Sequence, residues 1–143
     1  PYVGDETFML TYGDGVCNVN IDELVRFHKA SGKICTMTSI QATSRFGVIK
    51  IEEDGTIDSF EEKPEESGTW INGGFFVIEP SIKDYLKDDA DDMMWERQPM
   101  NDLARDRQIA AYKHHDFWKC MDTIRDKEEL EEMWATQPDW KIW

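Results

Sequence analysis

The stretch Phe8-Met9-Leu10-Thr11-Tyr12-Gly13-Asp14-Gly15-Val16 decides the fold, because an apolar run is followed at once by a Gly-Asp-Gly turn. A continuous apolar run, here residues 8–10, is typical of a strand buried on both faces. Such strands belong to parallel sheets that carry helices on both sides. In open sheets of this kind, ligands bind outside the carboxyl ends of the strands. We therefore expect Asp14 to lie at the ligand-binding edge of an α/β sheet.

The chemistry of Asp14 follows from its neighbours. The glycines on either side would let a ligand approach the backbone closely. A carboxylate in that place suits a hard cation such as Mg²⁺ that carries phosphate oxygens. Gly-Asp-Gly is also ordinary turn chemistry, so these residues alone leave a turn without function as an equal alternative.

The length and composition indicate a single domain with an acidic surface. The chain has 143 residues, 40% of them hydrophobic, which is enough to bury a core. Its 30 Asp and Glu residues outnumber 16 Lys and Arg residues, giving a formal net charge of −14. Nucleic acids and anionic membranes would repel such a surface and are poor candidates as partners. We find no signal peptide and no apolar stretch long enough to span a bilayer.

The cysteines indicate a reducing compartment. Cys17, Cys35 and Cys120 are odd in number and show no Cys-x-x-Cys spacing, which is typical of free thiols. We therefore expect a cytoplasmic protein. His114-His115 together with Cys120 would be a weak zinc site, since zinc ligands usually come in pairs.

Helix and strand patterns alternate after the Gly-Asp-Gly turn. Asn20, with Glu23 three residues later, predicts a helix with a capping box, and Gly32 predicts its end. Strands at residues 8–10 and 34–40 flank this helix, so the three elements predict a βαβ unit with a parallel pair of strands.

The rest of the chain gives further elements. Asp54-Gly55 predicts a hairpin turn, and Gly73-Gly74 interrupts the most apolar strand, which indicates a bulge or the close approach of a ligand. His28 is expected to be a half-buried packing residue, and the tail offers no obvious place to bury its two tryptophans. Strands are expected at residues 48–51, 56–60, 70–78 and 109–112, and helices at 82–92, 99–105 and after a Thr123 cap with Asp126, with Leu130, Met133 and Trp134 facing inward.

Four stretches, in the same order along the chain, resemble the sugar-nucleotide pyrophosphorylases. They are Thr11-Tyr12-Gly13-Asp14-Gly15-Val16, Phe60-Glu61-Glu62-Lys63-Pro64, Trp70-Ile71-Asn72-Gly73-Gly74-Phe75-Phe76, and Phe117-Trp118 through Met121-Asp122-Thr123. The resemblance implies a Rossmann-like nucleotide-diphospho-sugar transferase sheet with flanking helices. It also implies transfer of CMP from CTP to glucose 1-phosphate, giving CDP-glucose and pyrophosphate.

The resemblance implies a role for three catalytic residues. Asp14 and Asp122 match the family's two metal-binding aspartates, which hold Mg²⁺ on the nucleotide phosphates, and Lys63 matches the lysine that contacts the sugar phosphate. This set suits an in-line displacement at phosphorus, which depends on positioning and charge neutralisation. The plainer alternatives are a helix-dipole interaction for Asp122 and a solvated loop position for Lys63.

The resemblance also implies a sugar-binding set. Glu62 and Asn72 match residues that hydrogen-bond sugar hydroxyls, and Trp118 is either a wall of the pocket or a core residue. The full set of implied substrate-binding residues is Gly13, Gly47, Glu62, Lys63, Asn72, Gly73, Gly74 and Trp118. Where the family pattern has a polar residue and a proline, this sequence has Lys119-Cys120. We expect this departure to alter the local backbone near Asp122.

The family's Gly-rich phosphate loop, Gly-x-Gly-Thr-Arg with a following lysine, has no counterpart in this sequence. We therefore expect an N-terminally truncated, partial nucleotidyltransferase domain over residues 1–143 that does not turn over alone. A missing neighbouring strand would expose a sheet edge near residues 8–10, so a homo-oligomer is expected.

Two other functions are considered. One is a non-catalytic module that binds a sugar phosphate or only oligomerises. The other is a nucleoside-diphosphosugar glycosyltransferase, which also uses aspartates and a metal. It is disfavoured because Glu62-Lys63-Pro64 and Asn72-Gly73-Gly74 belong to the pyrophosphorylase pattern.

Overall fold

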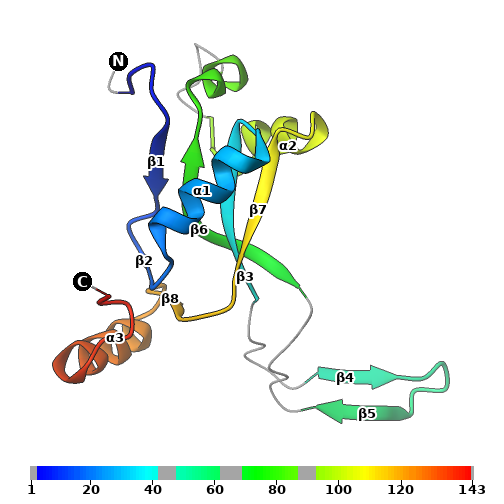
Figure 1. Cartoon of the computed structure of the whole chain (residues 1–143). Coiled ribbons are helices and arrows are strands. Elements are labelled where there is room, and N and C mark those ends of the chain that lie inside the picture. The colour runs from blue at the N-terminus through cyan, green and yellow to red at the C-terminus, as the bar shows by residue number, and fades with distance from the viewer. Residues whose placement is uncertain (1–2, 42–47, 62–68, 87–92, 143) are drawn as a thin grey trace.

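The structure is a computed structural model that describes residues 3–41, 48–61, 69–86 and 93–142 (Figure 1). Its elements in chain order are β1 (Phe8–Thr11), β2 (Gly15–Cys17), α1 (Ile21–Ser31), β3 (Cys35–Gln41), β4 (Val48–Ile51), β5 (Ile57–Glu61), β6 (Trp70–Ile78), the 3-10 helix η1 (Pro80–Tyr85), α2 (Gln98–Arg105), β7 (Ile109–His114), β8 (Trp118–Cys120) and α3 (Ile124–Thr136).

The main sheet has four strands in the order β1-β6-β3-β7. Strand β6 is antiparallel to both of its neighbours, and β3 pairs with β7 in parallel. Strands β1 and β3 therefore run parallel, as predicted, but their predicted direct pairing is wrong, because β6 lies between them. The reason is burial: Phe76, Val77 and Ile78 of β6 are at most 1% exposed, and a central position removes more of this apolar surface from water than an edge would.

Strand β1 lies at the edge of the sheet within the described residues. Phe8 and Leu10 pack against the core on one face, whereas Met9 on the other face is 55% exposed. The expectation that this strand is buried on both faces is therefore wrong for the part of the chain that the structure describes. The second face would need a further neighbour to cover it.

Helices cover both faces of the sheet, as the sequence predicted (Figure 1). On one face, Leu24 of α1 packs with Val19 and Val77. On the other face, η1 and α2 contribute Ile82 and Leu103 to a cluster that also contains Phe76. The larger apolar cluster therefore lies on the face of η1 and α2.

Helix α1 begins and ends where the sequence predicted. The Asn20 side chain accepts a hydrogen bond of 3.1 Å from the Glu23 amide, and Gly32 ends the helix with φ of +61°. His28 is 1% exposed, so the prediction of half burial is wrong. Its ring lies 2.8 Å from the Thr36 hydroxyl and 2.9 Å from a Glu79 carboxylate oxygen, and these two partners satisfy both ring nitrogens inside the protein.

Two helical segments differ from their predicted extent. Instead of an α-helix over residues 82–92, the structure has η1, which ends at Tyr85, and residues 87–92 lie outside the described part. In α3, Leu130 and Met133 are half-buried as predicted, but Trp134 is 56% exposed. Trp134 stacks on Trp140 of the tail, which in turn stacks on Phe117, so the tail tryptophan is covered by these rings rather than by the sheet.

The remaining strands agree with the predictions. Strands β4 and β5 form an antiparallel hairpin, and Gly55 in its turn has φ of +86°. The left-handed backbone at this position favours glycine. The sequence had not predicted β2 and β8, which pair as a short second sheet.

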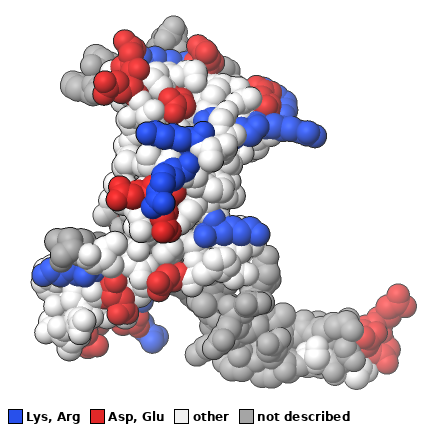
Figure 2. All heavy atoms as spheres, in the orientation of Figure 1, with Lys and Arg blue, Asp and Glu red and all other residues white. Residues whose placement is uncertain are grey.

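The surface carries charges of both signs. On the face drawn in Figure 2, the described Lys and Arg side chains lie among Asp and Glu side chains rather than in one basic patch. None of the described helices combines the length and the apolar composition needed to cross a membrane.

The three cysteines are free thiols, and their reactivities are predicted to differ. Burial raises the pKa of the Cys35 thiol to about 12. Burial is also the largest cause that raises the pKa of the Cys17 thiol to about 11. At pH 8 the reactive thiolate of Cys35 is then about 10⁻⁴ of the total. Iodoacetamide should therefore alkylate the half-buried Cys120 at least about a hundredfold faster than Cys35. Peptide mass mapping over time measures this, and equal rates in the folded chain would contradict the prediction. In denaturant all three thiols should react alike.

Candidate functional site

The two predicted metal aspartates lie on adjoining loops. Strand β2 pairs with β8, which sets Gly15 opposite Cys120. Directly beside this pair, the Met121 amide donates a 2.7 Å hydrogen bond to the Asp14 carbonyl. Asp14 and Asp122 are both exposed. The loops that carry Asp14 and Asp122, from distant parts of the sequence, thus lie side by side.

The backbone that carries Asp122 is fixed by the first turn of α3. One carboxylate oxygen of Asp126 accepts hydrogen bonds from the Asp122 amide at 3.2 Å, the Thr123 amide at 2.9 Å and the Thr123 hydroxyl at 2.8 Å. This is the predicted capping box. Asp122 itself precedes the helix and accepts a 3.2 Å hydrogen bond from the Cys120 thiol. It lies directly before the N-cap of α3, at the positive end of the helix dipole.

The departure at Lys119-Cys120 does not break the local backbone. Both residues belong to β8 and pair with β2. The ammonium of Lys119 lies 2.6 Å from a carboxylate oxygen of Glu129 and so connects β8 to α3. Lys119 and Arg125 hold the pKa of the Glu129 carboxyl below its usual value.

Replacing Asp126 by alanine should lower the free energy of unfolding by about 1–3 kcal/mol, because three hydrogen bonds at a helix N-terminus are lost. Urea denaturation followed by circular dichroism measures the change. The control is Glu128→Ala on the exposed side of the same helix, which should change stability by less than about 0.5 kcal/mol. Equal effects of the two substitutions would count against the capping role.

The donor set at this edge fits Mg²⁺. Among the described residues, no group of three or more His, Cys, Asp and Glu side chains could hold a metal ion. Two carboxylates are nevertheless sufficient for Mg²⁺, which usually keeps waters and substrate phosphates as its other ligands. The zinc alternative has no such support: His114 bonds to the Phe117 carbonyl at 3.2 Å, and the His115 ring packs edge-on against Trp70.

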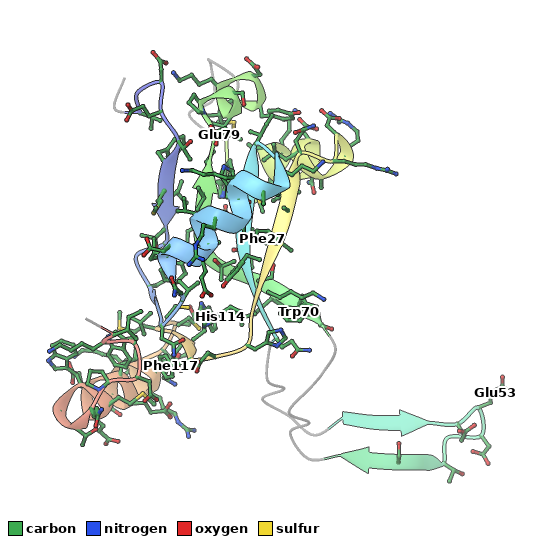
Figure 3. The ribbon with its side chains drawn as sticks, in the orientation of Figure 1. Phe27, Glu53, Trp70, Glu79, His114 and Phe117 are labelled. Carbon is green, nitrogen blue, oxygen red and sulfur yellow. The ribbon has the colours of Figure 1, made fainter. Side chains whose placement is uncertain are left out.

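The predicted sugar-binding segment of β6 adjoins the same loops. The Tyr12 amide donates to the Gly74 carbonyl at 3.0 Å, directly before Gly13 and Asp14. Trp118, which is half-buried, donates from its indole nitrogen to the Gly73 carbonyl at 2.8 Å. Trp118 therefore connects β8 to β6. Figure 3 shows Trp70, His114 and Phe117 toward this end of the sheet and Glu79 at the opposite end.

Gly73 and Gly74 lie where a larger side chain would not fit, each because of a different neighbour. A Cβ atom on Gly73 would lie 2.9 Å from the Thr38 carbonyl oxygen, so glycine allows β6 to approach β3 closely at the point where β6 bulges. Gly74 has φ of +79°, and a Cβ there would lie 3.0 Å from the Tyr12 ring. Both glycines are thus explained by contacts within the protein. Of the two predicted reasons for a Gly pair in this strand, a bulge or the close approach of a ligand, the structure shows the bulge. Gly13 is exposed, and an added Cβ would meet nothing within 4 Å.

Two residues of the site were not singled out from the sequence. The Tyr12 hydroxyl accepts a 3.0 Å hydrogen bond from the Asn72 amide nitrogen. Burial, and then the influence of the Glu96 carboxylate, raise the pKa of Tyr12 to about 12. Glu96 follows Trp95 in a segment that belongs to none of the four family stretches, so no sequence pattern indicated that it lies near Tyr12.

Three predicted site residues, Gly47, Glu62 and Lys63, lie outside the described residues, as does the rest of the Arg45-Phe46-Gly47 segment. Their roles stay predictions from the resemblance. The described part of the site is therefore Gly13, Asp14, Asn72, Gly73, Gly74, Trp118 and Asp122.

The fold is that of the nucleotidyl transferases. The chain belongs to this family, since the family model described as nucleotidyl transferase matches residues 2–132. The predicted resemblance and fold class are thereby confirmed. A solved structure from Bacillus anthracis, a putative glucose-1-phosphate thymidylyltransferase in complex with a sucrose, matches with a TM-score of 0.60 and 18% identity, over 90% of this chain and 54% of that one. At that identity the likeness shows the fold alone.

The curated relatives are more specific. The chain is 43% identical to a probable glucose-1-phosphate cytidylyltransferase of Bacillus subtilis, over 99% of this chain and 55% of the relative. It is 44% identical to the glucose-1-phosphate cytidylyltransferase of Salmonella typhi, over 97% of this chain and 53% of the relative. The chain thus spans about half the length of these relatives.

Proposed function

We propose that this chain supplies the metal-binding aspartates and the sugar-phosphate half of the active site of a glucose-1-phosphate cytidylyltransferase. The single observation that carries the proposal is the hydrogen bond from the Met121 amide to the Asp14 carbonyl. It joins the Asp14 and Asp122 loops, and bonds from Tyr12 to Gly74 and from Trp118 to Gly73 connect these loops to the Asn72–Gly74 segment. The similarity to the cytidylyltransferases of Bacillus subtilis and Salmonella typhi supports CTP and glucose 1-phosphate as the substrates.

In the proposed reaction, Asp14 and Asp122 would hold Mg²⁺, which neutralises charge on the nucleotide phosphates. A phosphate oxygen of glucose 1-phosphate attacks the α-phosphorus of CTP. The bond from this phosphorus to the bridging oxygen breaks, and that oxygen leaves with pyrophosphate. The attacking phosphate is already an anion, so the chain needs no general base. Asn72 would bind sugar hydroxyls, and by resemblance Glu62 and Lys63 would bind the sugar and its phosphate.

The second candidate is a non-catalytic module that binds a sugar phosphate. Such a module would use the same Asn72–Gly74 segment, which adjoins the Asp14 loop through the bond from the Tyr12 amide to the Gly74 carbonyl. The two candidates differ in turnover, not in sugar-phosphate binding, so one experiment separates them.

The experiment is a calorimetric titration of glucose 1-phosphate into this chain with and without Mg²⁺, repeated on Lys63→Ala. We expect binding that is lost in the variant. A chimera that joins this chain to the part of the Bacillus subtilis relative that it does not span should then form CDP-glucose from CTP. Binding without turnover of the chimera would favour the module, and the absence of binding would contradict both candidates.

We also propose that the chain self-associates in a reducing cytoplasm. The support is the free edge of β1 in the described sheet, with Met9 55% exposed, and the three free thiols. An unpaired edge recruits other strands. Light scattering at high protein concentration tests this, and a monomer would contradict it.

A further inference from the structure

We propose that Trp118 is a positioning residue whose indole N–H fixes the Gly73–Gly74 peptide group. This peptide in turn holds the side-chain amide of Asn72 in the orientation that recognises the sugar. The inference deepens the proposed function and rests on it. It gives Trp118 a role through its nitrogen atom, whereas a wall of the pocket would act through the ring.

The Gly73–Gly74 peptide group is hydrogen bonded on both sides by side chains. Trp118 Nε1 donates to the Gly73 carbonyl oxygen at 2.8 Å. The Gly74 amide at the other side of the same peptide donates to Asn72 Oδ1, also at 2.8 Å. In a trans peptide the oxygen and the amide hydrogen point in opposite directions within one rigid plane. The bond that fixes the carbonyl therefore also fixes the direction of the amide that orients Asn72.

This peptide needs such a bond, because it lies between two glycines. Glycine populates positive and negative φ about equally, so a Gly-Gly peptide plane turns over more easily than others. Gly74 has φ of +79°, and the peptide lies within the irregularity of the β3–β6 pairing. Both glycines are buried, so a plane turned away from Trp118 would leave the Gly73 carbonyl without this donor. The Trp118 N–H thus stabilises one of the orientations open to the plane.

The orientation of the peptide decides the orientation of the Asn72 amide. Since a backbone N–H can only donate, the Asn72 oxygen must face Gly74. Asn72 Nδ2 then faces the Tyr12 hydroxyl at 3.0 Å. One N–H of Asn72 and one lone pair of its oxygen remain for a ligand. A donor beside an acceptor is the pattern that matches a sugar hydroxyl.

The indole itself is held by the strands that lead to the two aspartates. Trp118 belongs to β8, which pairs with β2 and ends two residues before Asp122. An added Cβ on Gly15 would lie 3.9 Å from Trp118 Nε1, so the nitrogen lies close to the residue that follows Asp14. The same nitrogen therefore connects the predicted sugar-binding segment to the strands that carry the predicted metal ligands.

The test replaces Trp118 by 3-benzothienylalanine through an amber codon, since this side chain keeps the two-ring shape and has sulfur in place of the N–H. The 143-residue chain in Mg²⁺ is titrated calorimetrically with glucose 1-phosphate, galactose 1-phosphate, mannose 1-phosphate and inorganic phosphate. The Kd for glucose 1-phosphate should rise about three- to tenfold, as expected for the loss of one hydrogen bond. The preference over the two epimers should fall by a similar factor, and the Kd for inorganic phosphate should stay within about twofold.

Two controls match this replacement. 5-Fluorotryptophan in place of Trp118 keeps the N–H and should bind glucose 1-phosphate as the unmodified chain does. 3-Benzothienylalanine in place of Trp134, which lies on α3 and is 56% exposed, should leave every Kd unchanged. Equal losses with both analogues of Trp118 would show that the shape of the ring matters and not its N–H, which would overturn the inference.

A second readout does not depend on binding. In ¹⁵N spectra of the free chain, the Gly74 amide and the Asn72 side-chain amide should shift when 3-benzothienylalanine replaces Trp118 and stay in place when it replaces Trp134. Shifted signals with an unchanged epimer preference would overturn the inference, because the peptide would then not position the sugar. Normal signals and binding with this analogue, together with weaker binding by Trp118→Phe, would make the ring a wall of the pocket. That result would overturn the inference and leave the proposed function standing, whereas an unmodified chain that binds no glucose 1-phosphate would overturn both.

Discussion

Asp122→Asn is expected to reduce CDP-glucose formation by the chimera at least about a hundredfold, because a neutral amide binds Mg²⁺ far more weakly than a carboxylate. The side chain keeps its shape, and the bonds from the Asp122 and Thr123 amides to Asp126 stay in place. The fold should therefore survive. Asp14→Asn on the adjoining loop should have an effect of similar size.

The measurement is the initial rate of CDP-glucose formation as a function of Mg²⁺ concentration. Both variants should need more Mg²⁺ than the unmodified chimera to reach half of their maximal rate. Asp139→Asn in the exposed tail is the matched control and should retain full activity. Activity within a few-fold of normal in both site variants would show that these aspartates do not hold the metal.

Phe76→Ala should cost about 3–5 kcal/mol of unfolding free energy, the range observed for large-to-small substitutions of buried aromatic residues. Phe76 is 1% exposed at the centre of the sheet and touches the rings of Tyr12 and Trp95. Its removal would leave a cavity beneath both. Since a small domain has only about 5–15 kcal/mol of stability, the variant should be close to unfolding.

Urea denaturation of the unmodified chain and of the Phe76→Ala variant measures this loss of stability. The matched control is Phe27→Ala, which removes the same side chain from a position on α1 that is 37% exposed. Phe27 contacts Tyr112 edge-on, so we expect a smaller loss of about 1–2 kcal/mol. If both variants lost equal stability, the packing of the sheet around Phe76 would not be the main source of the core's stability.

Local features were predictable because their causes are local. Asn20 and Thr123 accept hydrogen bonds from amides three residues ahead, and Gly32 takes a left-handed backbone, so both helix starts and one helix end could be predicted from short patterns. The turn at Asp14 was predictable in the same way. The family followed from four short stretches in order, which the match over residues 2–132 confirms.

The partners of each strand were not predictable from periodicity. The pattern of β1, α1 and β3 predicted an adjacent pair, but β6 lies between the two strands. An apolar run indicates that a strand is buried, but it does not indicate which strand lies beside it. The choice depends on the total apolar surface that the whole sheet removes from water, to which the distant residues 70–78 contribute most.

The amino-acid sequence by itself determined the helix caps, the turn that carries Asp14 and the family, because these depend on neighbouring residues or on short motifs. Only the tertiary structure decided the position of β6, the contact between the Asp14 and Asp122 loops, and the hydrogen bond from Asn72 to Tyr12. Each of these joins segments far apart in the chain. Their formation depends on how the apolar faces pack together, which no short stretch of sequence specifies.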